Sequence, residues 1–164
     1  MIEIKESGKQ ISNACELYQL IPKDKLSRIF ETSQTVGAEC DYTFLGFEEV
    51  YKAVTLFVPK NKVVIDLGCA YAFQAWYFQE YRRYIGVDNG CKDARITLNE
   101  LGINNANYFS CSIQKFIEIV FPALPYTINE VFAVCSYVPD REAREMVRKF
   151  FPWCLVYYPT GNDV

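Results

Sequence analysis

The amino-acid sequence predicts one α/β domain, a three-layer sandwich in which helices cover both faces of a mostly parallel central sheet. Short β-branched runs alternate with helical segments from about residue 62 to residue 158, a pattern typical of parallel strands joined by helical crossovers. The chain has 164 residues, which fits a single domain of roughly 150 residues. Hydrophobic residues make up 51% of the chain, enough to bury a core.

Residues 1–60 are expected to form an N-terminal helical region that precedes the sheet. Apolar residues at helical spacing predict a helix over 12–20, and Pro22 can open a second helix over 23–36. A third helix is expected over 47–57, where apolar residues recur every three to four positions. We expect this region to pack on the core domain at 61–164 or to cover its site.

The core region is expected to hold five strands, and no repeat or linker divides it. The strands are predicted at 62–67, 83–88, 107–112, 130–136 and 153–158. The helices between them are predicted at 71–82, 92–101 and 113–120, followed by a last helix that Asp140 can cap. Aromatic residues crowd the first of these helices, and core packing is expected for them rather than a stacking platform for bases.

Composition argues against several classes of function. Lys and Arg number 17 against 20 Asp and Glu, a formal net charge of -3, which is unlike a protein whose main task is non-specific nucleic-acid binding. The absence of histidine removes Ser-His and Cys-His pairs and His-ligated zinc. The seven cysteines form no CxxC pair, so we expect no metal site and a chain with reduced thiols in the cytoplasm. We expect no signal peptide, because residues 1–10 lack an apolar stretch, and no apolar run approaches the roughly 20 residues of a membrane span.

Two neighbouring strands end in residues that predict a nucleoside site. The first strand ends in Asp66-Leu67-Gly68, where the glycine allows a sharp turn and a close approach of a ligand to the backbone. The second strand ends in Asp88, 20 residues after Gly68, where a carboxylate can accept hydrogen bonds from both hydroxyls of a ribose. Because the carboxyl ends of parallel strands meet at one edge of the sheet, these residues should flank one crevice.

The segments VVIDLGCAYA (63–72) and YIGVDNG (84–90), with the strand pattern around them, resemble the class I S-adenosylmethionine-dependent methyltransferases. This resemblance implies a Rossmann-like sandwich with strand order 3-2-1-4-5, truncated after the fifth strand, whereas the family usually adds two more strands. It also implies S-adenosylmethionine as cofactor, S-adenosylhomocysteine as product, and transfer of a methyl group to an acceptor that the sequence does not identify.

In that family the loop after the first strand has the form D-x-G-x-G-x-G. The resemblance places Asp66 near the methionine end of the cofactor, with Gly68, Cys69 and Ala70 along the turn. Ala70 and Ala72 stand where the family has its second and third glycines. Because alanine disfavours a positive φ, we expect a tighter pocket or a lower affinity for the cofactor.

The next two strand ends would hold the nucleoside. The resemblance implies that Asp88 binds the ribose and that Asn89 lies near the adenine edge. Ser112 falls where the family usually has an aspartate that reaches the adenine amine, and Ile113 would pack nearby. A serine in place of a carboxylate would weaken this one contact.

The end of the fourth strand would face the transferred methyl group. The resemblance assigns Cys135 and Ser136 to this place, and Tyr137 and Asp140 follow as weak candidates for a catalytic role. Methyl transfer is an in-line displacement that depends mainly on proximity, so a general base is optional. Asp140 could equally act only as a helix cap.

Two other functions stay open. The chain could be a module that binds S-adenosylmethionine or S-adenosylhomocysteine but works by interaction alone, which the two alanines and the missing strands favour. It could also bind a nicotinamide dinucleotide, although that motif needs a third glycine at position 73, where the chain has Phe73.

Two surface features bear on partners. The fifth strand, 153–158, is apolar and would form an edge of the sheet if no strand follows it, and a free edge invites pairing with another chain. A homodimer or a partner protein is therefore expected there. Basic residues along 141–149 are expected to form a solvated helix face rather than a phosphate site.

Overall fold

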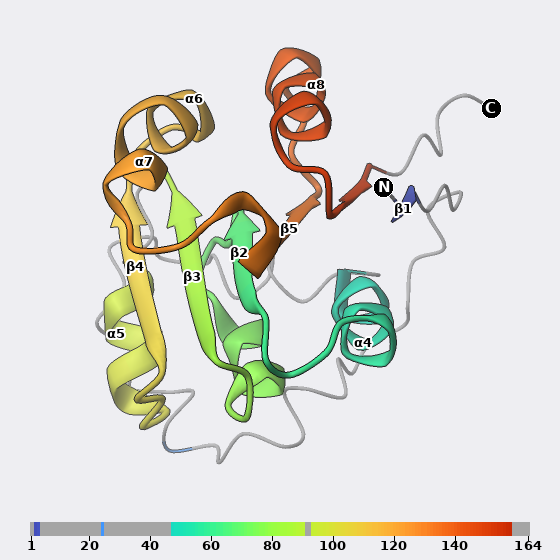
Figure 1. Ribbon diagram of the computed structural model, residues 1–164. Coiled ribbons are helices and arrows are strands. Elements are labelled where there is room, and N and C mark those ends of the chain that lie inside the picture. Colours follow the sequence, from blue (N-terminus) through green and yellow to red (C-terminus); the bar gives the residue numbers. More distant parts are fainter. Residues whose placement is uncertain (1, 4–23, 25–46, 91–92, 159–164) are drawn as a thin grey trace, which may run out of the picture.

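The computed structural model describes residues 2–3, 24, 47–90 and 93–158 (Figure 1). The helices expected over 12–20 and 23–36 lie outside these residues, apart from Asp24. The helix expected over 47–57 is present as α4 (Phe47–Phe57).

A six-stranded parallel sheet forms the middle layer. Its strands are β1 (Ile2–Glu3), β2 (Val63–Leu67), β3 (Arg83–Asp88), β4 (Ala106–Ser110), β5 (Val131–Ser136) and β6 (Cys154–Tyr157). They are ordered β1-β6-β5-β2-β3-β4, and each neighbouring pair is parallel. The five expected strands therefore occur in the expected order, which confirms the predicted fold class.

Helices cover both faces of this sheet (Figure 1). One layer contains α4, the 3₁₀-helix η1 (Phe73–Phe78) and α5 (Ala94–Glu100). The other contains α6 (Ile113–Lys115), the π-helical segment η2 (Phe116–Val120), α7 (Phe121–Ala123) and α8 (Arg141–Phe150). A further 3₁₀ turn, η3 (Ile128–Glu130), leads into β5.

Two hydrophobic cores fill the space between the layers, because successive side chains of a strand point to opposite faces. In β2, Val64 packs in the core under α4 and η1, whereas Val63 and Ile65 pack in the core under η2 and α8. Tyr84 and Ile85 of β3 divide in the same way.

The segment 71–82 departs from the expected helix. Only Phe73–Phe78 is helical, and it is a 3₁₀-helix that follows Ala72 in the left-handed conformation with φ 60°. A left-handed residue cannot continue a right-handed helix, so the loop after β2 uses the first residues of the segment. The aromatic residues of this segment serve the core, as expected: Tyr71, Phe73 and Phe78 are buried.

The expectation of a free edge at the fifth predicted strand is wrong over the residues that β1 covers. Ile2 and Glu3 run parallel to Leu155 and Val156 of β6 and take up that edge. Two residues give no periodicity from which a strand could be predicted, so β1 was not expected. A homodimer or a partner protein stays a prediction.

None of the helices that the structure describes is long and apolar enough to cross a membrane.

Candidate functional site

A crevice of about 520 Å³ lies at the carboxyl ends of β2, β3 and β5. It is closed on one side by the start of α6 and on the other by the first turns of α8. Both the volume and the position are typical of ligand sites in parallel α/β folds. The predicted site residues that line it are Gly68, Ala70, Asp88, Asn89, Ser112, Ile113, Ser136, Tyr137 and Asp140.

The loop after β2 forms the floor of the crevice in an unusual backbone conformation. Gly68, Ala70 and Ala72 all have positive φ, at 84°, 51° and 60°. A side chain at Gly68 is also excluded by space, because an added Cβ would lie 2.6 Å from Cγ2 of Val138. The two alanines adopt the conformation for which glycine is suited, without the glycine.

Asp88 joins this loop to the end of β3. Its Oδ2 accepts a hydrogen bond from the Ala70 amide at 2.8 Å, and its Oδ1 accepts one from the Gly90 amide at 2.7 Å. A carboxylate offers about four acceptor positions, so each oxygen can accept one more hydrogen bond. Two neighbouring hydroxyl groups of a ligand are suitable donors for these positions.

On the α6 side of the crevice, Ser112 has a structural role. Its hydroxyl oxygen caps α6 by accepting a hydrogen bond from the Lys115 amide at 3.1 Å. Ile113 beside it is partly buried and contributes apolar surface to the same wall. Asn89, across the crevice at the end of β3, is exposed.

Ser136 ends β5 and carries a polar group without a hydrogen bond. Its side chain is 4% exposed, and its hydroxyl finds no partner among the residues that the structure describes. Leaving a buried hydroxyl unpaired is unfavourable by about 1–3 kcal/mol. Because Ser136 lines the crevice, a ligand is a natural partner for this group.

The loop after Ser136 is strained and firmly held. Tyr137 has φ 59°, its amide donates to the Tyr157 carbonyl at 2.9 Å, and its ring meets that of Tyr157 edge-on at 5.2 Å. Arg144 on α8 donates to the carbonyl oxygens of Val138 and Pro139 at 2.7 and 2.8 Å. Strained backbone of this kind persists where the surrounding structure enforces it, commonly at functional sites.

Asp140 acts as the N-cap of α8, as the sequence allowed. Its Oδ1 accepts from the Glu142 amide at 2.9 Å and from the Ala143 amide at 3.3 Å.

Three predicted site residues, Asp66, Cys69 and Cys135, do not line the crevice and are fully buried. The Asp66 carboxylate points into the core under α4, where Tyr51, Gln74 and Tyr84 donate hydrogen bonds to it. Burial raises the pKa of Asp66 from 3.8 to about 6, and these three hydrogen bonds oppose the rise.

Neither buried thiol is suited to nucleophilic chemistry. Burial raises the pKa of Cys69 well above its ordinary value, and burial raises the pKa of Cys135 to about 12. Both thiols therefore stay protonated near neutral pH. Cys69 packs its sulfur against Gly86, where an added Cβ would lie 2.9 Å away.

Two residues that shape the site were missed in the sequence. Gln74 is the polar residue in an otherwise apolar segment, Tyr71 to Phe78, and a buried amide in such a place calls for polar partners. Arg144 was counted among the basic residues of a solvated face, yet it braces Val138 and Pro139 and lies 4.3 Å over the Tyr158 ring. Arg148 pairs with Glu145 at 3.3 Å, so part of the basic surface of α8 is used within the fold.

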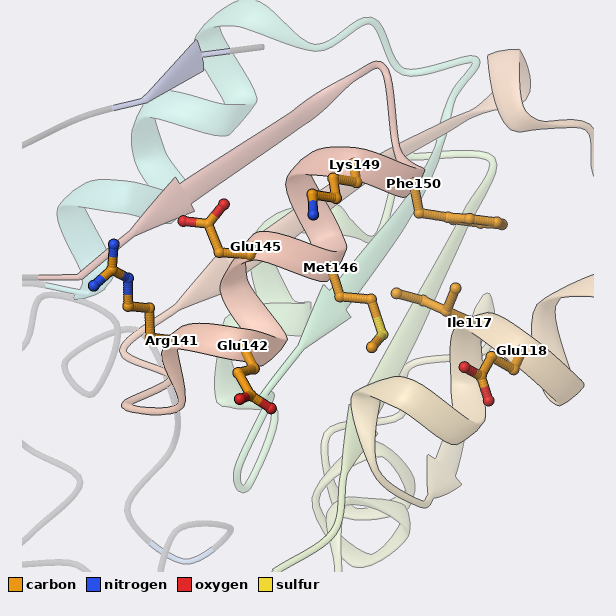
Figure 2. Close-up of a pocket in the computed structure, with 8 residues that line it drawn as sticks. All are labelled: Ile117, Glu118, Arg141, Glu142, Glu145, Met146, Lys149 and Phe150. Atoms are coloured by element: carbon orange, nitrogen blue, oxygen red, sulfur yellow. The ribbon is translucent and has the colours of Figure 1, made fainter.

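A second hollow, of about 510 Å³, lies between α8 and η2 and shares Glu142 and Met146 with the crevice. Figure 2 shows Met146 and Ile117 pointing toward one another at its base. No strand ends in this hollow, and its rim is formed by charged side chains of both signs. The crevice is the better candidate because strand ends and an unpaired hydroxyl converge there.

Solved structures identify the fold. The chain matches an rRNA methylase from Streptococcus thermophilus with a TM-score of 0.51 and 12% sequence identity, over 71% of this chain and 74% of that one. The fold is that of the class I methyltransferases. No protein-family model matches the sequence, and no curated protein matches it significantly.

Two more distant methyltransferase structures also match. One is the PRMT1 enzyme–prozyme complex of Trypanosoma brucei with AdoHcy, at TM-score 0.48 and 20% identity, over 66% of this chain and 34% of that one. The other is the plantazolicin methyltransferase BpumL with SAH, at TM-score 0.45 and 15% identity, over 85% of this chain and 56% of that one. The chain thus spans about a third of the PRMT1 chain and just over half of BpumL.

Proposed function

We propose that the crevice binds S-adenosylmethionine and that the protein transfers the methyl group to an acceptor. The observation that carries the proposal is the pairing of Asp88, which has acceptor capacity to spare, with the unpaired hydroxyl of Ser136 across the same crevice. Both sit at strand ends of a methyltransferase fold. The donors and acceptors therefore fit a ligand that has a ribose and further polar groups.

Different residues of the crevice would bind different parts of the cofactor. Asp88 would accept from the two ribose hydroxyls, and Ile113 would pack on the adenine, with Asn89 and Ser112 near its polar edge. Ser136 would donate to or accept from the amino-acid end. The loop from Gly68 to Ala70 would contact the cofactor through its backbone, whereas Asp66, Cys69 and Cys135 would support the site from within the core.

When bound, S-adenosylmethionine supplies an electrophilic methyl group on a sulfonium that leaves as a neutral thioether. The protein then has to align the acceptor, exclude water and let a proton leave. Tyr137 is placed to align the acceptor and to exclude water, since Tyr157 holds its backbone just after the end of β5. Asp140 already accepts two amides of α8, so we assign it a structural role.

The protein is proposed to work in the cytoplasm. All four cysteines that the structure describes, Cys69, Cys111, Cys135 and Cys154, are free thiols. This fits a reducing compartment.

Calorimetric titration with S-adenosylhomocysteine, followed by transfer of labelled methyl groups to a panel of acceptors, tests the proposal. Binding with turnover supports the enzyme, and binding without turnover on any acceptor supports the interaction module. A chain that binds NADH but not S-adenosylhomocysteine would contradict both and support the dinucleotide alternative.

A further inference from the structure

We infer that Gln74 and Asp66 are positioning residues, which hold the loop after β2 in its binding shape through a buried polar cluster shared with α4. The cluster consists of Asp66, Tyr51, Gln74 and Tyr84, and we call it the Asp66 cluster. The inference rests on the proposed function, because this loop is the floor of the proposed cofactor crevice. It replaces the direct contact with the cofactor that the sequence implied for Asp66.

Three different elements direct a donor at the Asp66 carboxylate. Tyr51 of α4 donates to Oδ1 at 2.7 Å, Gln74 of η1 donates to Oδ2 at 2.7 Å, and Tyr84 of β3 donates to Oδ2 as well. All four side chains are buried. Because a buried carboxylate without donors is very unfavourable, these three contacts fix the carboxylate and each other.

Gln74 connects this cluster to the loop backbone. Its Nε2 also donates to the Cys69 carbonyl at 2.9 Å, and a side-chain amide has two hydrogens to give. The same carbonyl accepts from the Ala72 amide at 2.8 Å and so closes the turn over residues 69–72. One side chain therefore links the carboxylate in the core to the turn under the crevice.

The loop needs such a link. Ala70 and Ala72 both have positive φ, a conformation that alanine disfavours. With glycines at these positions, the backbone could adopt this shape without steric strain. In this chain the shape has to be enforced by tertiary contacts, and the Ala70 amide then reaches Asp88.

The link that Gln74 makes between Asp66 and the loop after β2 should depend on the charge of Asp66. The titratable groups that influence it are Tyr51 from α4, Tyr84 and Asp88 from β3, Cys69 from the loop and Cys135 from β5. A neutral carboxyl accepts weaker hydrogen bonds than a carboxylate, so a proton on Asp66 would weaken the contacts that Tyr51, Gln74 and Tyr84 make with it. Since the pKa of Asp66 is raised to about 6 by burial, the support of the loop should weaken as the pH falls through this value.

The first test needs no ligand and compares two variants by amide hydrogen exchange. Gln74→Met keeps the volume but removes the hydrogen bonds that Nε2 donates to Asp66, to the Cys69 carbonyl and, at 3.5 Å, to the Tyr51 hydroxyl. The matched control is Tyr81→Phe, which removes a buried hydroxyl that donates to the Val58 carbonyl at 2.7 Å, outside the Asp66 cluster. We expect the Ala70 and Ala72 amides to exchange at least about tenfold faster in Gln74→Met than in the control. Equal exchange in the two variants would overturn the inference.

The second test measures the affinity for S-adenosylhomocysteine between pH 5 and pH 7. We expect the unmodified protein to lose affinity when the pH is lowered below about 6. The affinity of Asp66→Asn should not change over this range. The affinity of Gln74→Met should be at least about tenfold weaker than that of the unmodified protein at pH 7. If the unmodified protein binds and Gln74→Met shows the same affinity and the same pH step, the inference is wrong. If the unmodified protein binds at no pH, the proposed function fails, and the exchange experiment alone decides the role of Gln74.

Discussion

The backbone amide of Ala70 donates to the Asp88 carboxylate at 2.8 Å, and this bond joins the loop after β2 to the end of β3. Together with the parallel pairing of β2 and β3, the bond brings two segments that are separated in the chain into one surface. It also means that Asp88 has two tasks, because it shapes the loop and faces the crevice.

Replacing Asp88 by alanine should weaken the binding of S-adenosylhomocysteine by about 1–3 kcal/mol, since the ribose hydroxyls lose their acceptor. Calorimetry measures this directly. Glu80→Ala is the matched control, because it removes an exposed carboxylate that pairs with Lys60 outside the crevice. Equal affinities for the two variants would show that Asp88 does not bind the ligand.

Ala70→Gly should raise the free energy of unfolding by up to about 1 kcal/mol, because glycine adopts the φ of 51° without steric strain. Urea denaturation measures the change. Ala75→Gly is the control: Ala75 lies in η1 and is buried, so there the same substitution should destabilise the protein. A loss of stability in Ala70→Gly similar to that in Ala75→Gly would contradict the strain at this position.

Gly68→Ala should destabilise the protein by roughly 1–3 kcal/mol, because alanine at φ 84° is strained and its Cβ would clash with Cγ2 of Val138. In the Val138→Ala background the clash is absent, so the same substitution should have a smaller effect. A double-mutant cycle measures this coupling between the two loops. Strict additivity of the two substitutions would show that the loops do not touch as described.

Asp66 should make the protein less stable at neutral pH than at mildly acidic pH, because the unfavourable burial of its charge outweighs the stronger hydrogen bonds that the charged form accepts. Its pKa is raised by burial from 3.8 to about 6 in the folded state. The stability that it contributes is therefore complete below about pH 4 and is lost as the pH rises through 6, by roughly 3 kcal/mol at 1.36 kcal/mol for each pKa unit. Glu80, which is exposed, and Glu130, which is partly exposed, have lowered pKa values and act in the opposite direction.

Comparison with Asp66→Asn removes the contribution of those other groups, because they are unchanged in the variant. The difference in unfolding free energy between the two proteins should vary with pH between 4 and 7, in favour of the unmodified protein at low pH. A difference that is constant over this range would show that the folded-state pKa of Asp66 is not raised.

The strands and the crevice could be predicted from sequence because their signals are local. The run Val63–Ile65 is β-branched and apolar, and Gly68 and Asp88 follow two neighbouring strands at the edge where such folds bind ligands. The sequence also allows a prediction of the face of the sheet to which the Asp66 side chain points. In a strand it shares the face of Val64, which packs under α4, so the period of two already turned its carboxylate toward the core.

The remaining features depend on contacts between segments that are distant in sequence. In place of the first residues of the helix expected over 71–82, the structure has a loop with a left-handed Ala72. Gln74 links the turn of this loop to Asp66 of β2. The bracing of Val138 by Arg144 depends on how α8 packs beside β5. The two-residue strand β1 depends on its pairing with β6. None of these interactions leaves a periodic signal in its own segment.

The central claim is that the crevice between β2, β3 and β5 holds the nucleoside of S-adenosylmethionine. The crystal structure of the complex with S-adenosylhomocysteine tests it most directly. The account predicts both ribose hydroxyls within hydrogen-bond distance of the Asp88 carboxylate and a ligand atom bonded to the Ser136 hydroxyl. A nucleoside bound in the hollow between α8 and η2, or a crevice still empty at saturating ligand, would contradict it.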